Sequence, residues 1–188
     1  MSTNSWQQTL ITQQVDGTAL SNTTTPTSII APAARFVLPS NLFQIGTKLR
    51  INAGGRISTV VTSPGNLTLD VRLGTVVVFN GGASALNVTA QTNTTWELEI
   101  NLICRSIGAS TSATILGIAK WWTRASLNAP AVGTTTGVGV VLLPDTAPTV
   151  GTGFDSTASQ AVDLFATWGT ASASNSIRCD SYELVLCN

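Results

Sequence analysis

Apolar side chains recur at every second residue over long stretches of this chain, a period that fits an extended strand and not a helix. Between Asn66 and Gly74, leucine and valine alternate with Thr, Asp and Arg. Between Thr95 and Arg105, Trp, Leu and Ile alternate with mostly polar residues. Gly, Pro and β-branched residues interrupt most windows in which a helix could form. The chain is therefore expected to be all-β.

Six further segments carry a strand signal, and clusters of Gly, Pro, Asn and Ser separate most of the strands. The six are Lys48–Thr59, Leu86–Gln91, Ala113–Arg124, Val138–Leu143, Ala161–Trp168 and Asn175–Leu186. Within Asn175–Leu186 the apolar phase changes after Cys179, as one inserted bulge residue would produce, and a bend is expected at Gly54-Gly55. Eight short strands predict an antiparallel sandwich, and we expect an eight-stranded jelly roll because it leaves no long bare edge.

The usual jelly-roll order would place the second, fourth, fifth and seventh strands along the chain in one sheet. These four are Asn66–Gly74, Thr95–Arg105, Ala113–Arg124 and Ala161–Trp168. That sheet would carry eight charged side chains on its outer face. They are Asp70, Arg72, Glu97, Glu99, Arg105, Lys120, Arg124 and Asp163. Opposite charges on neighbouring strands could pair, each pair contributing about 0.2–1 kcal/mol. A plain solvated sheet face is the simpler interpretation.

Residues 1–41 differ from the rest and are expected to form an extended N-terminal arm, with the jelly-roll domain at 42–188. The arm has a low-complexity patch at Asn22–Thr27 but more apolar side chains than a disordered tail needs. Seven of them are candidates for a partner interface: Trp6, Leu10, Ile11, Val15, Ile29, Ile30 and Phe36. The arm would dock on its own core, a neighbouring subunit or a larger surface, or part of it is another core strand. Deleting Met1–Thr27 is expected to abolish docking and leave a folded core.

Composition excludes several kinds of chemistry. Histidine is absent, which excludes Ser-His-Asp and Cys-His catalysis and histidine-bound zinc. Nine basic and nine acidic residues give zero net charge without a basic block, so nucleic acid is not an expected partner. The polar surface comes instead from 29 Thr, 18 Ser and 12 Asn. We expect no cofactor and no metal site, although calcium held by loop oxygens near Asp145, Asp155 and Asp163 is left open.

Targeting signals and disulfide patterns are also missing. The first 30 residues contain one charge, Asp16, and lack the basic and apolar regions of a secretory signal. The charge-free stretches Leu73–Trp96 and Ala125–Pro144 are broken by Gly, Pro, Asn and Thr, so no membrane span is expected. Three cysteines without metal-binding spacing are expected to be buried free thiols. They are Cys104, Cys179 and Cys187.

Candidate catalytic groups are few. Glu97 and Glu99 share a strand face and could pair a general acid with a general base, as in glycoside hydrolysis. No aromatic-lined cleft is evident around them, so enzyme activity is not expected. Trp121-Trp122 should place one indole inward and one outward, where it marks a partner or sugar contact or packs under a loop. In the loops at the ends of the sandwich, Phe154 is the aromatic residue that is expected to be exposed.

Five runs of residues carry a family resemblance. They are Gly55–Thr59 (GRIST), Pro64–Gly74 (PGNLTLDVRLG), Trp96–Ile100 (WELEI) and Gly151–Thr157 (GTGFDST), which leads into Val162–Phe165 (VDLF). With these runs, residues 42–188 resemble jelly-roll structural proteins of tailed-bacteriophage virions, particularly head decoration (cement) proteins. The resemblance implies a non-enzymatic protein, commonly a homotrimer, that binds the major capsid protein or other virion proteins and reinforces the lattice. It implies a role for no single residue.

A capsid decoration protein, made in the host cytoplasm and carried in the virion, is therefore the expected function. Two alternatives stay open. The first is a receptor-binding or fibre-head domain of a phage tail, whose end loops would recognise a glycan or a protein. The second is a shell-forming jelly-roll capsid protein, which would normally have a basic arm, whereas residues before Arg35 contain no Lys or Arg.

Overall fold

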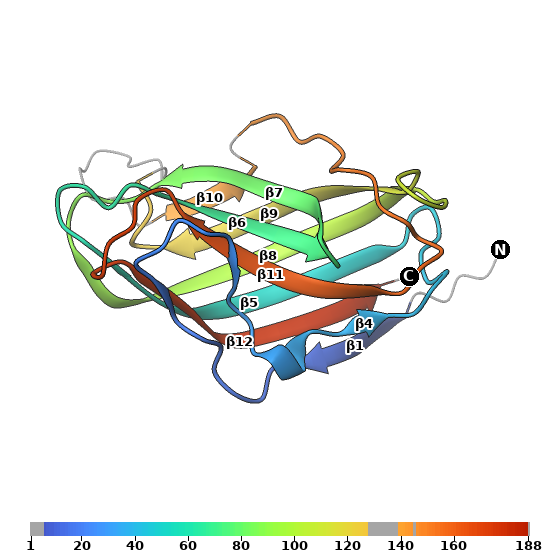
Figure 1. The fold of residues 1–188 in the computed structure, drawn as a ribbon, viewed down its shortest axis with the longest axis horizontal. Coiled ribbons are helices and arrows are strands. Elements are labelled where there is room, and N and C mark those ends of the chain that lie inside the picture. The colour runs from blue at the N-terminus through green and yellow to red at the C-terminus, as the bar shows by residue number, and fades with distance from the viewer. Residues whose placement is uncertain (1–5, 128–138, 145, 188) are drawn as a thin grey trace.

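The long strands form where side chains alternate, and they build two antiparallel sheets that face each other across one core (Figure 1). The structure is a computed structural model and describes residues 6–127, 139–144 and 146–187. Over these ranges the chain is all-β, apart from one 3-10 turn at Pro32–Ala34. The expected class, an all-β antiparallel sandwich, is confirmed.

Each sheet combines strands from distant parts of the chain. The larger sheet contains β1 (Gln7–Thr12), β2 (Leu20–Ser21), β5 (Lys48–Thr59), β8 (Gln91–Ser106), β9 (Thr114–Thr123), β10 (Gly139–Leu143) and β12 (Ser176–Cys187). Its order is β1-β12-β5-β8-β9-β10, with β2 also beside β12. The smaller sheet contains β3 (Thr27–Ser28), β4 (Val37–Leu38), β6 (Asn66–Leu73), β7 (Val76–Ala85) and β11 (Gln160–Trp168). Its order is β3-β11-β6-β7, with β4 also paired to β11.

This order corrects the expected grouping of strands. β6 and β11 lie in the smaller sheet, whereas β8 and β9 lie in the larger one, so the four strands expected in one sheet are divided between two. The eight charged side chains are divided with them. Asp70, Arg72 and Asp163 belong to the smaller sheet, and the other five belong to β8, β9 and the residue after β9. Alternation determines which face a side chain takes, but it carries no information on which distant strands pair.

Two expected strand positions also change. Most of Leu86–Gln91 is irregular: Leu86 makes an isolated bridge to Ser126, and the Asn87 carboxamide accepts a hydrogen bond from the Thr89 backbone N–H at 2.9 Å. The strand that follows β6 is instead β7, which runs through Asn80-Gly81-Gly82, a sequence that is typical of a turn. A Cβ on Gly81 would lie 2.8 Å from the Leu69 carbonyl oxygen, so glycine lets β7 approach β6 closely.

The bulge expected in the last strand is confirmed. The register between β12 and β5 shifts between Cys179 and Ser181. Gly54 and Gly55 lie opposite this bulge, and a Cβ on Gly55 would stand 2.0 Å from the Arg178 carbonyl oxygen. Glycine is therefore required where the bulged backbone of β12 comes closest to β5.

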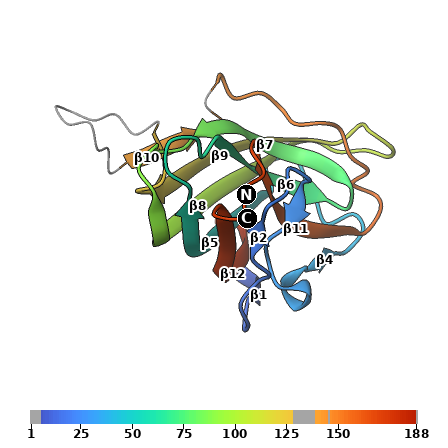
Figure 2. The same cartoon turned by 60° about the vertical axis from the view of Figure 1, so that its left-hand side comes forward.

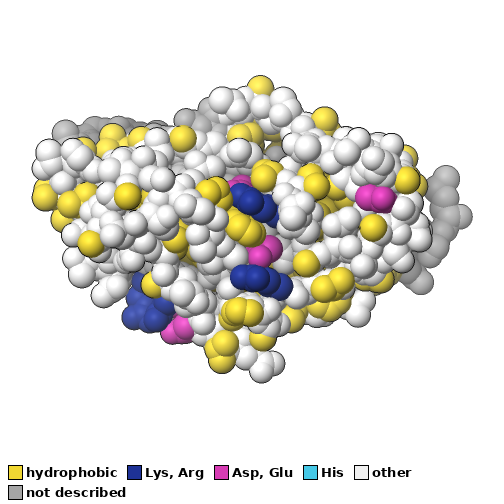
Figure 3. All heavy atoms as spheres, viewed as in Figure 1, with side chains coloured by type: hydrophobic (Ala, Val, Ile, Leu, Met, Phe, Trp, Pro, Cys, Tyr) yellow, Lys and Arg dark blue, Asp and Glu magenta, His cyan; other side chains and the backbone are white. Residues whose placement is uncertain are grey.

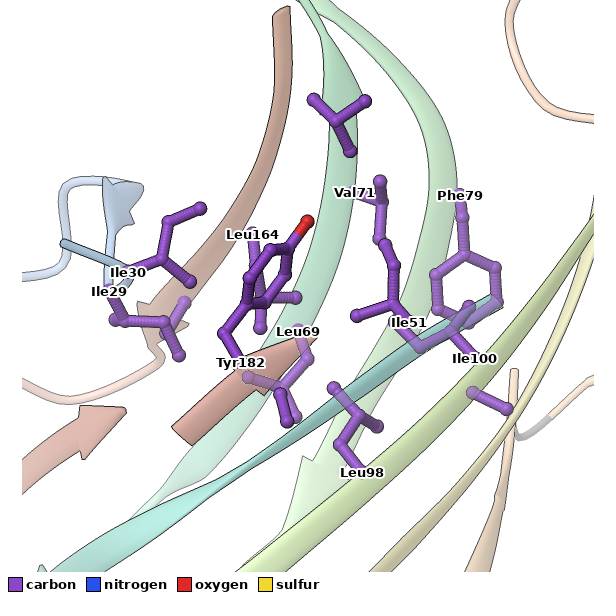
Figure 4. Packing of buried hydrophobic residues seen from close by; sticks show 14 of the residues in the cluster. Ile29, Ile30, Ile51, Leu69, Val71, Phe79, Leu98, Ile100, Leu164 and Tyr182 are labelled. Carbon is purple, nitrogen blue, oxygen red and sulfur yellow. The ribbon is translucent and has the colours of Figure 1, made fainter. Parts of the chain in front are cut away.

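The core lies between the sheets and is built from the inward face of each long strand. Figure 4 shows Ile51, Leu98 and Ile100 of the larger sheet opposite Leu69, Val71 and Leu164 of the smaller sheet, with Tyr182 among them. Trp96, Trp121 and Trp168 are also fully buried. Full burial of one aliphatic side chain contributes about 1.5–3 kcal/mol, so this set dominates the stability of the fold.

Residues 6–38, which we call the N-terminal segment, join the two sheets along one side of the sandwich. β1 and β2 pair with β12 of the larger sheet, and β3 and β4 pair with β11 of the smaller sheet. Figures 1 and 2 show this segment, in blue, beside β12 and β11. The segment is thus an integral part of the sandwich edge.

Candidate functional site

The seven candidate residues of the N-terminal segment lie at three depths. Ile29 and Ile30 are buried in the chain's own core. Leu10, Ile11 and Phe36 are half-buried and pack against that core. Trp6 and Val15 have exposed fractions of 44% and 62%. Of the seven side chains, a partner could therefore reach those of Trp6 and Val15 without displacing the segment. Ile29 and Ile30 lie inside the core, as the alternative that part of the segment belongs to the core would have it.

An ion pair and a hydrogen bond fasten the segment to the outer face of β11. The Asp163 carboxylate accepts a hydrogen bond from the Ser28 hydroxyl and lies 3.0 Å from the Arg35 Nε. On the neighbouring strand, Arg72 pairs with Asp70 at 2.7 Å, and its guanidinium lies 3.9 Å from the centre of the Phe165 ring. Figure 3 shows acidic and basic side chains gathered in the middle of this face. We call Ser28, Arg35 and Asp163 the β11 latch.

Burial dominates the electrostatics of the latch. It raises the pKa of the Asp163 carboxyl above the ordinary 3.8, and the Ser28 hydrogen bond and the Arg35 charge oppose that rise without cancelling it. The carboxylate is therefore held in place at a desolvation cost. Such a pair fixes geometry more than it adds stability.

Glu97 and Glu99 share the outer face of the larger sheet, as expected, and Glu183 of β12 joins them there. Asn52 of β5 lies opposite both Glu99 and Glu183 in the strand register. The three carboxylates, which are all the glutamates of the chain, line a groove of about 400 Å³ together with Trp122. An aromatic residue thus stands beside Glu97, although none was expected there, because the register pairs Glu97 with Trp122.

The tryptophan pair is placed as expected, and the loop aromatic is not. Trp121 is fully buried, and Trp122 lies half-buried on the outer face. The expectation that Phe154 is exposed is wrong. Its side chain is buried and packs edge-on against Phe43, with ring centres 5.2 Å apart. A backbone bridge between Phe154 and Ala113 holds this loop residue inside the fold.

The cysteines are free thiols, as expected. Cys104 and Cys179 are buried, and Cys187 is half-buried. Burial raises the pKa of Cys179 to about 12 and also raises the pKa of Cys104. Because the thiolate is the reactive form, these two buried thiols are poor nucleophiles at neutral pH.

The described ranges contain no group of three or more Cys, Asp or Glu side chains placed to hold a metal ion. Among the aspartates considered for calcium, Asp145 lies outside those ranges and Asp163 belongs to the β11 latch. Asp155 accepts hydrogen bonds from the Thr157 hydroxyl at 2.6 Å and backbone N–H at 2.8 Å. The hydroxyl bond is the main cause that lowers the pKa of Asp155.

Comparison with known proteins adds no family. No protein-family model matches the chain, and no curated protein matches it. Among the residues with described positions, no helix has the length and apolar character of a membrane span. Function is therefore inferred from the surfaces of the chain itself.

Proposed function

We propose that this chain is a structural virion protein that binds and stabilises a bacteriophage capsid, as a decoration (cement) protein does. The observation that carries the proposal is the N-terminal segment. It is fastened to both sheets, yet Trp6, Val15 and Val37 have exposed fractions of 44%, 62% and 56%. Large apolar side chains on an already ordered segment can bind a partner with little loss of conformational entropy.

The chemistry of the chain supports a role in holding protein surfaces together without catalysis. Zero net charge and a Thr-rich composition give weak long-range repulsion between copies crowded on a lattice. In a trimer, which the family resemblance implies, three equivalent weak contacts would act at high effective concentration. The major capsid protein, or another virion protein, is the proposed partner.

The jelly-roll relationship belongs to the same proposal. In a jelly roll the outermost strands of the chain pair first with last and second with last but one. Counted from β5, the first strand after the N-terminal segment, β5 pairs with β12 and β6 pairs with β11, which is the same nesting. This nesting supports a jelly-roll relationship even though the sheets are divided differently.

Capsids that lack the protein provide the test. The purified chain is mixed with them, and bound copies are counted by density reconstruction. Stoichiometric occupancy at local three-fold positions is the expected result. Attachment only at a tail or a vertex would reject the decoration role and favour the receptor-binding alternative.

Point variants locate the contact. Trp6→Asp and Val15→Asp should each weaken capsid binding about tenfold or more, because a charge would be buried in the interface. Ile107→Asp is the matched control, since Ile107 is also exposed, at 48%, but lies outside the N-terminal segment. Equal loss of binding in all three variants would contradict a contact made through this segment.

A further inference from the structure

The outer face of the larger sheet carries a second surface, remote from the β11 latch in the strand order. Trp122 and Glu97 line two grooves at once. One groove, of about 580 Å³, includes Thr95, Arg124 and Val140, and the other is the 400 Å³ groove of the three glutamates. Because they share these two residues, the grooves form one trough across the sheet from β12 to β10, which we call the Trp122 trough.

The middle of the trough is an aromatic platform. Trp122 is half-buried, so its indole is anchored on the sheet and still borders open space on both sides. The π face of an indole is electron-rich and attracts the weakly positive C–H groups of a sugar ring. Flat, rigid and anchored rings of this kind lose little entropy when a ligand stacks on them.

The glutamates beside this platform retain hydrogen-bonding capacity. Among the residues whose positions are described, the Glu97 side chain makes no hydrogen bond or ion pair, and the Glu99 side chain accepts one hydrogen bond, from Asn101 at 3.2 Å. Four aspartates, by contrast, take part in ion pairs: Asp16, Asp70, Asp163 and Asp180. A carboxylate has about four acceptor positions, so both glutamates can accept hydrogen bonds from a ligand's hydroxyl groups.

The charge around the trough favours a neutral ligand. Lys120 lies opposite Glu99 in the register without forming an ion pair, and Arg124 lines the trough near Glu97. Arg50 lies two residues from Asn52 on the same strand face. Since these cations offset the three glutamates, the trough has little net potential to attract a cation or a basic peptide.

We propose that the Trp122 trough binds a neutral saccharide chain, with one sugar ring stacked on Trp122 and sugar hydroxyl groups donating to Glu97 and Glu99. The combination of a rigid aromatic platform, unfilled carboxylate acceptors and balanced charge fits a hydroxyl-rich, uncharged ligand. Saccharide binding goes beyond capsid binding and does not depend on it, because the three residues that would hold the sugar, Trp122, Glu97 and Glu99, lie on β8 and β9 and not in the N-terminal segment.

Calorimetric titration with cellohexaose, maltohexaose, chitohexaose and mannohexaose tests the proposal on the full chain. At least one of them should bind, and Trp122→Ala should weaken that binding about tenfold or more. Trp122→Phe should retain most of the affinity, since it keeps a smaller ring. Trp6→Ala is the matched control, because Trp6 is an exposed tryptophan outside the trough. Thermal unfolding of each variant shows whether the fold is kept.

Binding to a neutral sugar should also be nearly independent of salt and should weaken severalfold in Glu97→Gln, which has one acceptor oxygen fewer. Failure of all four sugars to bind would overturn the proposal, as would full affinity in folded Trp122→Ala. Tighter, salt-sensitive binding of a hexalysine peptide would instead assign the trough to a basic partner. Trp122→Ala should still bind capsids. Capsid binding measured on this variant therefore distinguishes a failure of the saccharide proposal from a failure of the decoration role.

Discussion

Gln13 joins three parts of the fold through one buried, uncharged side chain. Its Nε2 donates to the Cys179 carbonyl at 2.9 Å, and its Oε1 accepts from the Ala31 N–H at 3.0 Å. Its backbone N–H donates to the Tyr182 carbonyl at 2.8 Å. The bulge of β12 and the turn after β3 are thus tied together by a residue that no sequence motif marks.

Replacing this amide should be costly. In Gln13→Ala the Ala31 N–H loses its partner, and a buried group left unpaired costs about 1–3 kcal/mol, whereas the Cys179 carbonyl keeps the hydrogen bond from the Gly17 N–H at 2.7 Å. Gln14→Ala is the matched control, because Gln14 is exposed. Urea denaturation of the two variants measures the difference in unfolding free energy. Equal unfolding free energies would contradict a stabilising role for the hydrogen bonds of the Gln13 side chain.

Asp163 gives the β11 latch a pH dependence of defined sign. Its folded pKa is raised, so between the ordinary 3.8 and that higher value the folded chain binds more protons than the unfolded chain. The contribution of Asp163 to the unfolding free energy therefore decreases as pH rises through this window. Asp163→Asn cannot titrate, so the stability of the wild type minus that of the variant should fall as pH rises from about 3.8.

Urea titrations of both proteins at closely spaced pH values between 3 and 7 measure this difference. Other carboxylates titrate alike in both proteins and cancel in the subtraction. A difference that instead grows with pH would mean that Arg35 and Ser28 outweigh burial at this carboxyl.

At the scale of elements, the N-terminal segment should be required for folding. It supplies β1 and β2 to the larger sheet, and the Leu20 carbonyl accepts a hydrogen bond from the buried Trp168 indole at 3.2 Å. We therefore expect deletion of Met1–Thr27 to expose the edge of β12 and to unfold or strongly destabilise the sandwich. This expectation differs from the folded core that the sequence pattern alone predicts for the same deletion.

Circular dichroism and thermal melting of the truncated chain measure this outcome. Deletion of residues 1–5 alone is the control, because it leaves β1 complete. A truncated chain that lacks 1–27 and still melts cooperatively at the full-length temperature would restore the idea of a separable arm.

Most long strands could be predicted from alternation because one face of each is buried. β5, β6, β8, β9, β11 and β12 lie within a few residues of the expected ranges. β7 could not be predicted in this way, since Val76, Val77, Val78 and Phe79 form a continuous apolar run and Asn80-Gly81 is typical of a turn. The sheet to which each strand belongs could not be predicted from the sequence either, because it depends on the paths of connections between distant strands.

The candidate surfaces, too, could be predicted from the sequence only in part. The outward positions of Glu97, Glu99 and Trp122 follow from period two along each strand. Their meeting in one trough with Glu183 depends on the register of four strands, which includes the Cys179–Ser181 bulge. For the β11 latch, nothing in the sequence relates Ser28 and Arg35 to Asp163, which is 135 residues beyond Ser28.

At the scale of the whole molecule, two surfaces of different chemistry lie on one rigid sandwich. The N-terminal segment offers apolar side chains for protein contact, and the larger sheet offers the Trp122 trough. Because three strands separate β1 from β9, which carries Trp122, substitutions in the N-terminal segment and at Trp122 should act independently. The two proposals can therefore be tested independently in one set of variants.

Binding of this protein is expected to reinforce a capsid. Its most direct test is the temperature at which capsids lacking the protein release their genome, measured with a DNA-binding dye before and after saturation with the chain. Reinforcement predicts a higher release temperature at full occupancy, and no increase with Trp6→Asp at the same concentration. An unchanged release temperature on fully occupied capsids would contradict it.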